Sequence, residues 1–482
     1  MNFLLEGTFI LFKDSRKMNQ KNNEIRVAVI GSGPAGFYAC EHLFKKEDYN
    51  FSIDMFDKLP TPHGLVRSGV APDHQKIKSV TRVYDKIASN EKFRFYGLVE
   101  YGKHITFDDL KKHYHIIIFA TGAQTDRKMN IPGENLKGSH TATEFVAWYN
   151  GHPDYRDYKF DLSQERVAIV GVGNVAVDVA RILCRTEEEL MQTDIADYAM
   201  EALKKSKVRE VFLLGRRGPA QAAFTNPEVR ELGNLDDAHA ITQVEEVELD
   251  EFTRELLEKK EDRSLVKKIE ILNAYSEDIE FVKSKKLHIR FLVSPVEIIG
   301  DEEGRVKAIK LVKNELYRTD DGRLRPRATD NFEELEVGLV FRSIGYHGVP
   351  LPEIPFHEKW GVIHNEKGRV LDPVSGEHVN GLYATGWIKR GPSGVIGTNK
   401  QDSGETVECI MEDIISDKLL SPENPDADSI LKLICERQPD YFSYEDWLRL
   451  NELEVSRGQQ QGRPRIKYTS IEEMLDAIKK RN

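Results

Sequence analysis

Cysteine is scarce in this chain of 482 residues, with four widely scattered residues and no CxxC pair. A dithiol redox centre needs such a pair, and a compact zinc site needs closely spaced ligands, so we expect neither and predict no metal site. Few cysteines also suit a reducing compartment, where thiols stay free. Together with the missing targeting signal described next, this favours a cytoplasmic location.

Long apolar runs and an excess of positive charge are also missing. No stretch approaches the ~20 apolar residues that a membrane-spanning helix needs. The formal net charge is −11, which argues against nucleic-acid binding driven by counter-ion release. Residues 3–12 are apolar but contain Glu6, lack a basic flank before them and lack a small-residue cleavage site after them. We therefore predict that residues 1–24 form a mobile extension and that the rest is globular.

The first informative stretch is an apolar run at residues 26–30 that leads directly into the glycine turn GSGPAG. Such a run reads as a strand buried on both faces of a parallel sheet. A GxGxxG that follows a strand and opens a helix is typical of dinucleotide binding. Gly31 allows the tight turn, Gly33 lets the backbone approach a pyrophosphate, and Gly36 lets helix and strand pack closely.

The next predicted strand, residues 51–56, ends at Asp57. A carboxylate at this point hydrogen-bonds a ribose 2′-hydroxyl and disfavours a 2′-phosphate, so the ligand is NAD-like or the adenosine half of FAD. The alternative is a glycine-rich turn that holds no ligand. Residues 59–74 follow as a loop that is rich in Pro and Gly yet contains apolar residues, and we expect a bound ligand to order it.

The same pattern occurs a second time. Residues 166–170 form an apolar run that enters the turn GVGNVA at 171–176, and a helical pattern follows. The next strand, residues 208–214, ends without an acid, and Arg216 and Arg217 stand where the first unit has its carboxylate. Arginine at this place accommodates a 2′-phosphate through charge-assisted hydrogen bonds, so the second nucleotide is predicted to be NADP(H). An exposed pair of arginines on a turn is the alternative.

Between and after these units the sequence predicts four further features. Residues 185–207 form an inserted helical excursion, residues 288–312 alternate like a β-meander, and residues 337–344 form another buried strand. Residues 381–406 combine a strand, a glycine-dense turn with Trp387 and a helix that begins near Val395. Glycine at this density lets a flat ligand approach the backbone, so the stretch is predicted to hold a flavin ring. An ordinary connection around a buried Trp is the alternative.

Six motifs in one order resemble the adrenodoxin-reductase-type ferredoxin–NADP⁺ reductases, which are flavoproteins with two dinucleotide-binding domains. The motifs are GSGPAGFY (31–38), GLVRSGVAPDH (64–74), GNVAVDVAR (173–181), GRRGP (215–219), RSIGY (342–346) and GWIKRGPSGVIGTNK (386–400). The resemblance implies an α/β fold of two Rossmann-like three-layer domains, with the NADP domain inserted into a discontinuous FAD domain. The implied boundaries are 1–24 for the extension, 25–125 and 347–482 for the FAD domain with a C-terminal helical tail, and 126–346 for the NADP domain.

The resemblance also implies roles for individual residues. Contacts to FAD are expected, besides the first glycine turn, from Ala35, Asp57, Leu65, Val99, Trp387, Gly394, Val395 and Ile396. Contacts to NADP(H) are expected from Gly173, Asn174, Val175, Ala176, Arg216, Arg217 and Glu228. His74 and Asp178 match a His–Asp pair near the flavin and are the predicted catalytic residues.

The implied activity is hydride transfer from NADPH to N5 of FAD, followed by single-electron transfer to a small acidic ferredoxin of the [2Fe–2S] or a related type, or the reverse reaction. A docking patch for that partner is expected on the NADP domain, unless its lysines are merely solvated; the candidates are Lys204, Lys205, Lys207, Lys267 and Lys268. A glutamate-synthase-type subunit shares this plan but carries N-terminal cysteine clusters, and a disulfide reductase needs a CxxC. A flavin monooxygenase and a catalytically silent NADP-binding protein remain as alternatives.

Overall fold

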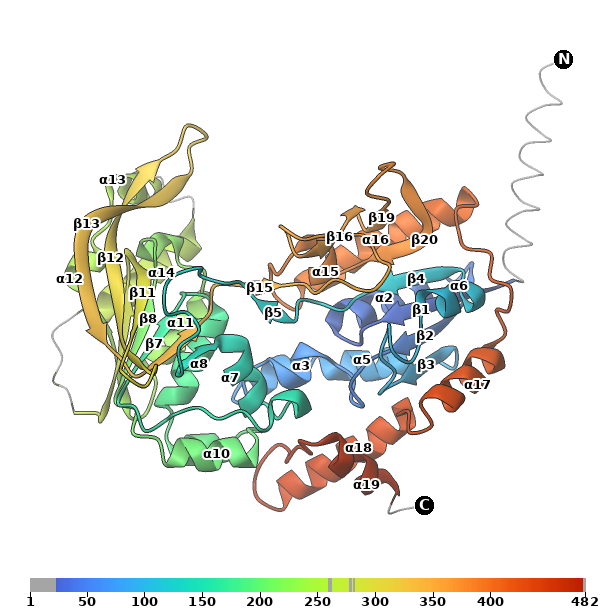
Figure 1. The fold of residues 1–482 in the computed structure, drawn as a ribbon, viewed down its shortest axis with the longest axis horizontal. Helices are drawn as coiled ribbons and strands as arrows, with labels where there is room; N and C mark the ends of the chain where they lie inside the picture. The colour runs from blue at the N-terminus through green and yellow to red at the C-terminus, as the bar shows by residue number, and fades with distance from the viewer. Residues whose placement is uncertain (1–22, 259–261, 277–279, 281, 480–482) are drawn as a thin grey trace.

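The computed structural model describes residues 23–479 except 259–261, 277–279 and 281, and it contains two large sheets in two lobes (Figure 1). Residues 1–22 of the predicted N-terminal extension lie outside the described residues. Among the helices of the described part, none is both long enough and apolar enough to cross a membrane.

The first sheet has seven strands in the order β18-β19-β20-β4-β1-β2-β3. Strands β1 to β4 and β20 run parallel, and β19 and β18 extend one edge in antiparallel fashion. Because β20 pairs directly with β4, early and late parts of the chain build this sheet together. Its strands are β1 (Glu24–Ile30), β2 (Asn50–Phe56), β3 (Phe93–Tyr96), β4 (Ile116–Phe119), β18 (Asn365–Glu366), β19 (Arg369–Leu371) and β20 (His378–Ala384).

Both faces of this sheet are covered, as the apolar run of β1 predicts. Val27 and Val29 pack in one core cluster, and Ala28 and Ile30 pack in another on the opposite face. This division follows from the alternation of side chains along a strand. The first face is covered by α2 (Pro34–Phe44), α5 (Thr81–Ala88) and α16 (Thr398–Ile415), and the second by α6 (Phe107–His113) and α17 (Ala427–Arg437).

The second sheet has six parallel strands in the order β6-β14-β7-β8-β10-β9. Helices cover one face, and a three-stranded antiparallel sheet covers the other. The six strands are β6 (Ser139–Thr141), β7 (Arg166–Val170), β8 (Glu210–Leu214), β9 (Ala238–Thr242), β10 (Lys285–Arg290) and β14 (Leu339–Arg342). The covering helices include α7 (Ala142–Tyr149), α8 (Asn174–Cys184), α9 (Glu187–Met191) and α10 (Asp197–Lys204).

The meander expected over residues 288–312 is partly wrong. His288 belongs to β10, an inner strand of the parallel sheet, and the meander begins only after Leu292, whose φ of 56° turns the chain. Alternation of apolar residues indicates a strand but does not tell a parallel neighbour from an antiparallel one. The antiparallel sheet consists of β11 (Val293–Gly300), β12 (Val306–Arg318) and β13 (Leu324–Glu336).

Two short strands connect the lobes. The chain leaves the first sheet after β4 through β5 (Thr125–Asp126) and returns through β15 (Tyr346–His347), which pairs with β5 in antiparallel fashion (Figure 1). The predicted boundaries at 125/126 and 346/347 fall within these strands, and as domain limits they stay predictions. A hairpin of β16 (Phe356–His357) and β17 (Val362–Ile363) then leads back to the first sheet.

The helices around the loops differ in detail from the sequence prediction. The loop at 59–74 contains the short α3 (Leu65–Ser68). The late stretch contains α15 (Trp387–Arg390), and the long helix begins at Thr398 rather than near Val395 because the Thr398 hydroxyl accepts the Val395 N–H within a preceding turn. The remaining helices are α4 (Gln75–Lys78), α11 (Asn226–Leu232), α12 (Val244–Val247), α13 (Glu251–Glu258), α14 (Arg263–Ala274), α18 (Tyr444–Gln459) and α19 (Ile471–Lys479).

Candidate functional site

The first glycine turn leaves its backbone open to a ligand. Gly31 has a φ of 107°, and a Cβ at this residue would lie 2.5 Å from the carbonyl oxygen of Ala120, so only glycine fits. A Cβ at Gly33 would meet no atom within 4 Å, which shows free space above the turn where α2 begins. Helix N-termini with exposed amides favour anionic groups, so the turn fits a pyrophosphate.

Asp57 follows β2 beside this turn. Its carboxylate accepts the backbone N–H of Ser32 and of Leu59, each at 2.9 Å. Burial raises the pKa of Asp57, while the hydrogen bonds from Ser32 and Leu59 oppose that shift. Among the described residues, Oδ1 of Asp57 accepts a hydrogen bond only from the Leu59 N–H, so it can also accept one from a ribose hydroxyl. Val99 was predicted to contact FAD. Its backbone N–H donates to the carbonyl of Asp57 at 3.0 Å, but its side chain is buried in the core.

The late glycine stretch lies against the first turn, as the flavin prediction requires. A Cβ at Gly386 would lie 2.5 Å from the Cβ of Ala35, so the two segments touch. The indole N–H of Trp387 donates to the carbonyl of Ser393 at 3.1 Å, and the Tyr346 ring packs on Trp387 with centroids 5.3 Å apart.

Two apolar side chains beside this contact are exposed. Leu65 is 39% exposed and Val395 is 58% exposed, while Ile396 packs on the first core cluster. Gly394, which directly precedes Val395 and Ile396, has a φ of 79°. Exposed apolar groups beside an open glycine turn are what a flat aromatic ligand covers, so these residues fit FAD.

The second glycine turn repeats the open geometry of the first. Gly171 has a φ of 130°, and a Cβ there would lie 2.1 Å from the carbonyl oxygen of Ser343. A Cβ at Gly173 would meet nothing within 4 Å. Asn174 begins α8 and accepts the Thr225 N–H at 2.9 Å, while the next two predicted contacts, Val175 and Ala176, lie in the first turn of that helix.

Arg216 and Arg217 follow β8 and form a cationic pair. Among the described residues, no carboxylate pairs with either guanidinium, although such pairs are frequent elsewhere on the surface of the protein. Burial and the neighbouring charge of Arg216 lower the pKa of Arg217. Two adjacent cations without a counter-ion fit a phosphate group, and the planar guanidinium suits bidentate contacts. This end of β8 therefore fits the 2′-phosphate of NADP(H).

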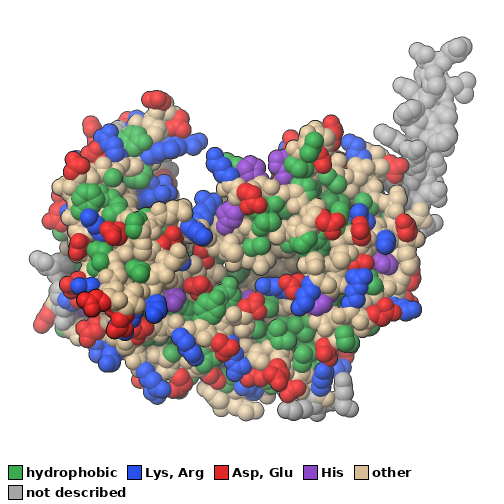
Figure 2. Space-filling model, viewed as in Figure 1, with side chains coloured by type: hydrophobic (Ala, Val, Ile, Leu, Met, Phe, Trp, Pro, Cys, Tyr) green, Lys and Arg blue, Asp and Glu red, His purple; other side chains and the backbone are tan. Residues whose placement is uncertain are grey.

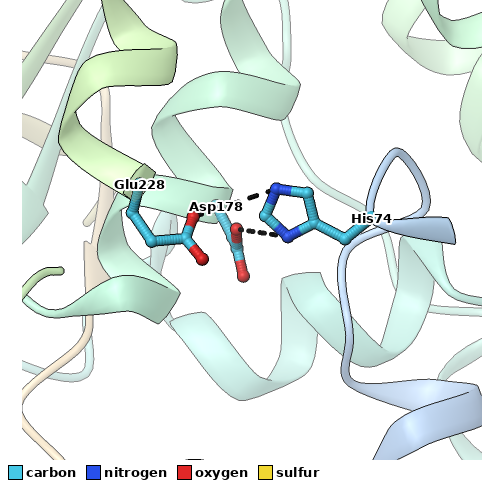
Figure 3. Close-up of side chains that lie close together, drawn as sticks. All are labelled: His74, Asp178 and Glu228. Atoms are coloured by element: carbon cyan, nitrogen blue, oxygen red, sulfur yellow. Dashed lines mark ion pairs between the residues drawn. The ribbon is translucent and has the colours of Figure 1, made fainter. Parts of the chain in front are cut away.

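His74 and Asp178 meet between the lobes, but they belong to a larger cluster (Figure 3). His74 Nδ1 lies 3.9 Å from Asp178, and Nε2 lies 3.9 Å from Glu228. Its shortest contact is a hydrogen bond of 2.9 Å that Nε2 donates to Glu231, a residue that the sequence prediction missed.

Arg181 joins the carboxylates of this cluster. Its buried guanidinium donates to Asp73 at 2.6 Å, to Asp178 at 2.6 Å and to Glu228 at 3.4 Å. Asp73 and Arg181 were also missed, although both lie within motifs that the sequence analysis quoted. The spacing of Asp178 and Arg181, three residues apart on α8, is the signal that could have indicated an ion pair.

The cluster perturbs the protonation of its members. Burial lowers the pKa of His74, but the hydrogen bond to Glu231 and the charges of Asp178 and Asp73 outweigh it and raise the pKa above 6.5. Burial and the charge of Asp178 raise the pKa of Glu228 to about 7. Because these groups interact, each pKa describes the titration of the coupled groups together and not of one residue alone. A carboxyl with a pKa of about 7 next to a histidine with a raised pKa, both near a nucleotide turn, indicates a place where protons are exchanged.

His74, Asp178 and Glu228 each place one possible metal-ligand atom within 4.8 Å of the others. The guanidinium of Arg181 already pairs with two of these side chains, and a fixed positive charge at this position opposes a second cation. The sequence prediction of no metal site stays a prediction.

Two open glycine turns of the dinucleotide-binding type, one in each of two lobes joined by the β5–β15 connection, define a flavoprotein oxidoreductase of the pyridine-nucleotide class. Residues 25–213 match the family model described as pyridine nucleotide-disulphide oxidoreductase. The chain is 42% identical to NADPH-ferredoxin reductase FprA of Mycobacterium tuberculosis over 462 residues, which covers 93% of this chain and 98% of that protein. It is 37% identical to the mitochondrial NADPH:adrenodoxin oxidoreductase of Arabidopsis thaliana, with 94% of this chain and 95% of that protein covered.

The structure is similar to that of Mycobacterium tuberculosis FprA in complex with NADPH, with a TM-score of 0.88 and 40% identity over 95% of this chain and all of that chain. The chain therefore belongs to the adrenodoxin-reductase-type ferredoxin–NADP⁺ reductase family. The predicted family, the α/β fold with two Rossmann-like domains and the cofactors FAD and NADP(H) are confirmed. The alternatives of a glutamate-synthase-type subunit and a silent protein are thereby disfavoured.

Most lysines of the predicted docking patch are held by local partners. Lys204 pairs with Glu187 at 2.6 Å, and Lys267 pairs with Glu270 at 2.9 Å. The ammonium of Lys268 donates to the carbonyl of Ala222 at 2.7 Å. Neutralised or internally bonded lysines attract a partner weakly, so Lys205 and Lys207 remain as the exposed cations of this group.

Proposed function

We propose that the partner of this ferredoxin–NADP⁺ reductase is a small ferredoxin of the [2Fe–2S] or a related type and that the reaction takes place in the cytoplasm. The observation that carries the proposal is the contrast between the two turns. Asp57 follows the strand at the first turn, whereas Arg216 and Arg217, with which no carboxylate of the described residues pairs, follow the strand at the second. Each lobe therefore selects a different dinucleotide, and the two lobes are joined by the β5–β15 connection (Figure 1).

In this proposal the first lobe holds FAD. The amides of the first glycine turn and the N-terminus of α2 bind the pyrophosphate, and Asp57 accepts the ribose hydroxyl. Leu65, Trp387 and the segment Gly394–Ile396 cover the flavin ring. Bound FAD supplies the conversion between two-electron and one-electron transfer, which an iron–sulfur protein requires.

The second lobe holds NADPH. Gly173 and the first turn of α8 bind the pyrophosphate, and the arginine pair binds the 2′-phosphate. Glu228 lies at the beginning of α11 and faces His74, so it is placed to accept a hydroxyl of the nicotinamide-side ribose. By fixing both ends of the nucleotide, these residues orient the nicotinamide and restrict its motion.

His74 and Asp178 control a proton in this arrangement. His74 lies at the end of the loop that follows β2, directly before α4, and Asp178 lies on α8, the helix that begins at the second glycine turn. The carboxylates of Asp178 and Glu231 stabilise the imidazolium, so His74 holds a proton at a point that both lobes share. Glu228, with its pKa of about 7, can exchange that proton at neutral pH.

The identity of the partner rests on the relatives. A Mycobacterium bovis relative named probable ferredoxin/ferredoxin–NADP reductase is 41% identical to this chain, and the matched region covers 76% of that longer protein. The cytoplasmic location is supported by the cysteines, which are all free.

The experiment is NADPH-driven reduction of cytochrome c by the purified holoprotein, with and without a [2Fe–2S] ferredoxin. A rate that rises with ferredoxin concentration and saturates supports the proposal. A rate that ferredoxin leaves unchanged, while NADPH still reduces ferricyanide, excludes the ferredoxin function and leaves a general NADPH diaphorase.

A further inference from the structure

A groove at the joint between the lobes combines cations with an exposed aromatic residue. It has a volume of about 320 Å³ and lies where the β5–β15 connection meets the β16–β17 hairpin. Figure 2 shows Lys, Arg and His side chains gathered on both sides of the notch between the lobes. The residues that line the groove are Thr125, Asp126, Arg127, Lys128, His347 and Lys359.

The charge of the groove is opposite to that of the whole molecule. Arg127, Lys128 and Lys359 are exposed, and within the described part of the chain no carboxylate forms an ion pair with them. The single carboxylate of the lining, Asp126, accepts a hydrogen bond of 2.9 Å from the Thr143 hydroxyl. A local positive surface on a chain of net charge −11 directs an acidic molecule to this place.

Trp360 adds an apolar anchor beside these cations. It lies in the turn between β16 and β17 and is 60% exposed. Val349, which is 37% exposed, lies near it because the Gly348 N–H donates to the carbonyl of Gly361 at 3.1 Å. Trp is among the residue types that carry most of the binding energy in protein interfaces, and Trp360 directly follows Lys359 of the groove.

The groove lies directly behind the wall of the proposed flavin site. The Tyr346 ring packs on Trp387, and the next residue, His347, lines the groove. A Cβ at Gly348 would lie 2.9 Å from Cδ1 of Ile388, so this segment is in contact with α15. A redox protein seated in the groove is therefore separated from Trp387 by Tyr346 and His347.

We propose that this groove and the Trp360 turn form the docking surface for an iron–sulfur protein whose cluster is surrounded by acidic side chains. The inference rests on the proposed ferredoxin function and assigns its partner to a surface. Arg127, Lys128 and Lys359 attract the acidic partner and set its orientation, and Trp360 contributes apolar contact area beside them. This surface differs from the lysine patch expected from the sequence.

The test is the KM for a [2Fe–2S] ferredoxin in the NADPH–cytochrome c assay of the holoprotein. Trp360→Ala and Lys359→Glu are each expected to raise that KM about tenfold, as loss of an interface anchor does. Both variants keep the rate of NADPH–ferricyanide reduction, which needs no ferredoxin. Leu448→Ala on α18 and Lys205→Glu are the matched controls and are expected to leave the KM unchanged.

Salt separates the two contributions. Added salt weakens the charge contacts, so the KM of the wild type rises with ionic strength, and Lys359→Glu flattens this dependence while Trp360→Ala preserves it.

Each other outcome has a definite meaning. An unchanged ferredoxin KM in both variants overturns the inference and leaves the proposed function intact. A raised KM in Lys205→Glu alone moves the docking surface to the lysine patch. A raised KM for NADPH in the ferricyanide assay assigns the groove to the nucleotide site and also overturns the inference. A wild type that never reduces ferredoxin contradicts the proposed function itself.

Discussion

His74 links the two lobes electrostatically. It lies on a loop of the first lobe, and its ring pairs with Asp178 and Glu228 of the second lobe. We expect His74→Gln to lower the turnover of NADPH–ferricyanide reduction about tenfold or more, the range of a lost general acid–base group, and to leave FAD bound. Steady-state rates at several pH values measure the effect.

The control for this substitution is His378→Gln, which alters a half-buried histidine paired with Glu366 at 3.2 Å. This variant is expected to keep the wild-type rate. A wild-type pH–rate profile in His74→Gln contradicts the proton-holding role.

Glu228 makes the stability of the protein depend on pH in a predictable direction. Its pKa is 4.5 in the unfolded chain and about 7 in the folded protein. Between these values the folded state binds a proton that the unfolded chain has lost, so this contribution to stability is complete below pH 4.5 and disappears as the pH rises through 7. The raised pKa of His74 adds a dependence of the same sign above pH 6.5.

Glu228→Gln mimics the protonated carboxyl and removes the first of these contributions. As the pH is raised from about 5 to about 8, the Tm of the wild type should therefore fall relative to that of the variant. Thermal unfolding followed by circular dichroism measures this difference. A constant offset between the two proteins across this range means that Glu228 is ionised throughout.

The arginine pair decides which nicotinamide nucleotide is used. Replacing Arg216 and Arg217 together by Ala should raise the KM for NADPH about 100-fold and leave the KM for NADH nearly unchanged, because only NADPH carries the 2′-phosphate. Steady-state kinetics with both nucleotides give the comparison. Arg323→Ala with Arg325→Ala, on the β12–β13 hairpin, is the matched control, and equal losses for NADPH and NADH contradict the assignment.

At the scale of elements, the inserted excursion at residues 185–207 ties the lobes and the C-terminal segment together. Asp194 lies between α9 and α10 and is 1% exposed. It accepts the ammonium of Lys78 from the first lobe at 2.7 Å and pairs with Lys467 of the C-terminal segment at 3.3 Å. The charges of Lys467 and Lys78 outweigh burial and lower the pKa of Asp194 to about 2. One carboxylate therefore joins three separate parts of the chain.

Asp194→Asn leaves two buried ammonium groups without their counter-ion. We expect the free energy of unfolding to fall by about 3 kcal/mol, the usual cost of breaking a buried ion pair. Asp197→Asn is the control, because Asp197 pairs with Arg463 but its side chain is 53% exposed. Urea unfolding of both variants tests the prediction, and equal stability of the two variants contradicts the role of Asp194.

Elements that depend only on residues close together in the sequence could be predicted from it. Both glycine turns follow apolar strands and open helices, so the sequence alone places Gly31, Gly33 and Gly173 correctly in their turns. The sequence also predicted the helical excursion at 185–207, which contains α9 and α10. The sequence did not reveal that β10 lies inside the parallel sheet, because alternation indicates a strand without naming its neighbours.

The partners in the candidate site could be predicted only in part. His74 and Asp178 were paired by resemblance, and the structure places them 3.9 Å apart. Glu231 and Arg181 were missed because their importance depends on how two lobes meet, and this contact joins residues more than 100 positions apart. Asp194 was missed for the same reason, since long-range ion pairs leave no periodic signal in a sequence.

The described part of the molecule consists of two nucleotide-binding lobes joined by the β5–β15 connection and by ion pairs between the lobes, with an acidic overall charge and a cationic groove at the connection. FAD and NADP(H) are assigned to opposite sides of the joint, and His74 and Asp178 lie between them. The proposed docking groove is lined by residues of the β5–β15 connection and the β16–β17 turn. This arrangement allows one partner to deliver electrons and the other to remove them without competing for one surface.

The central claim is that electrons pass from NADPH through this protein to a ferredoxin. The most direct measurement is anaerobic mixing of the yellow holoprotein with NADPH, followed by addition of oxidised [2Fe–2S] ferredoxin, with the absorbance of both chromophores recorded. The account predicts that NADPH bleaches the flavin band and that ferredoxin restores it while becoming reduced itself. A colourless preparation that takes up no FAD, or a bleached flavin that ferredoxin leaves bleached, would contradict the claim.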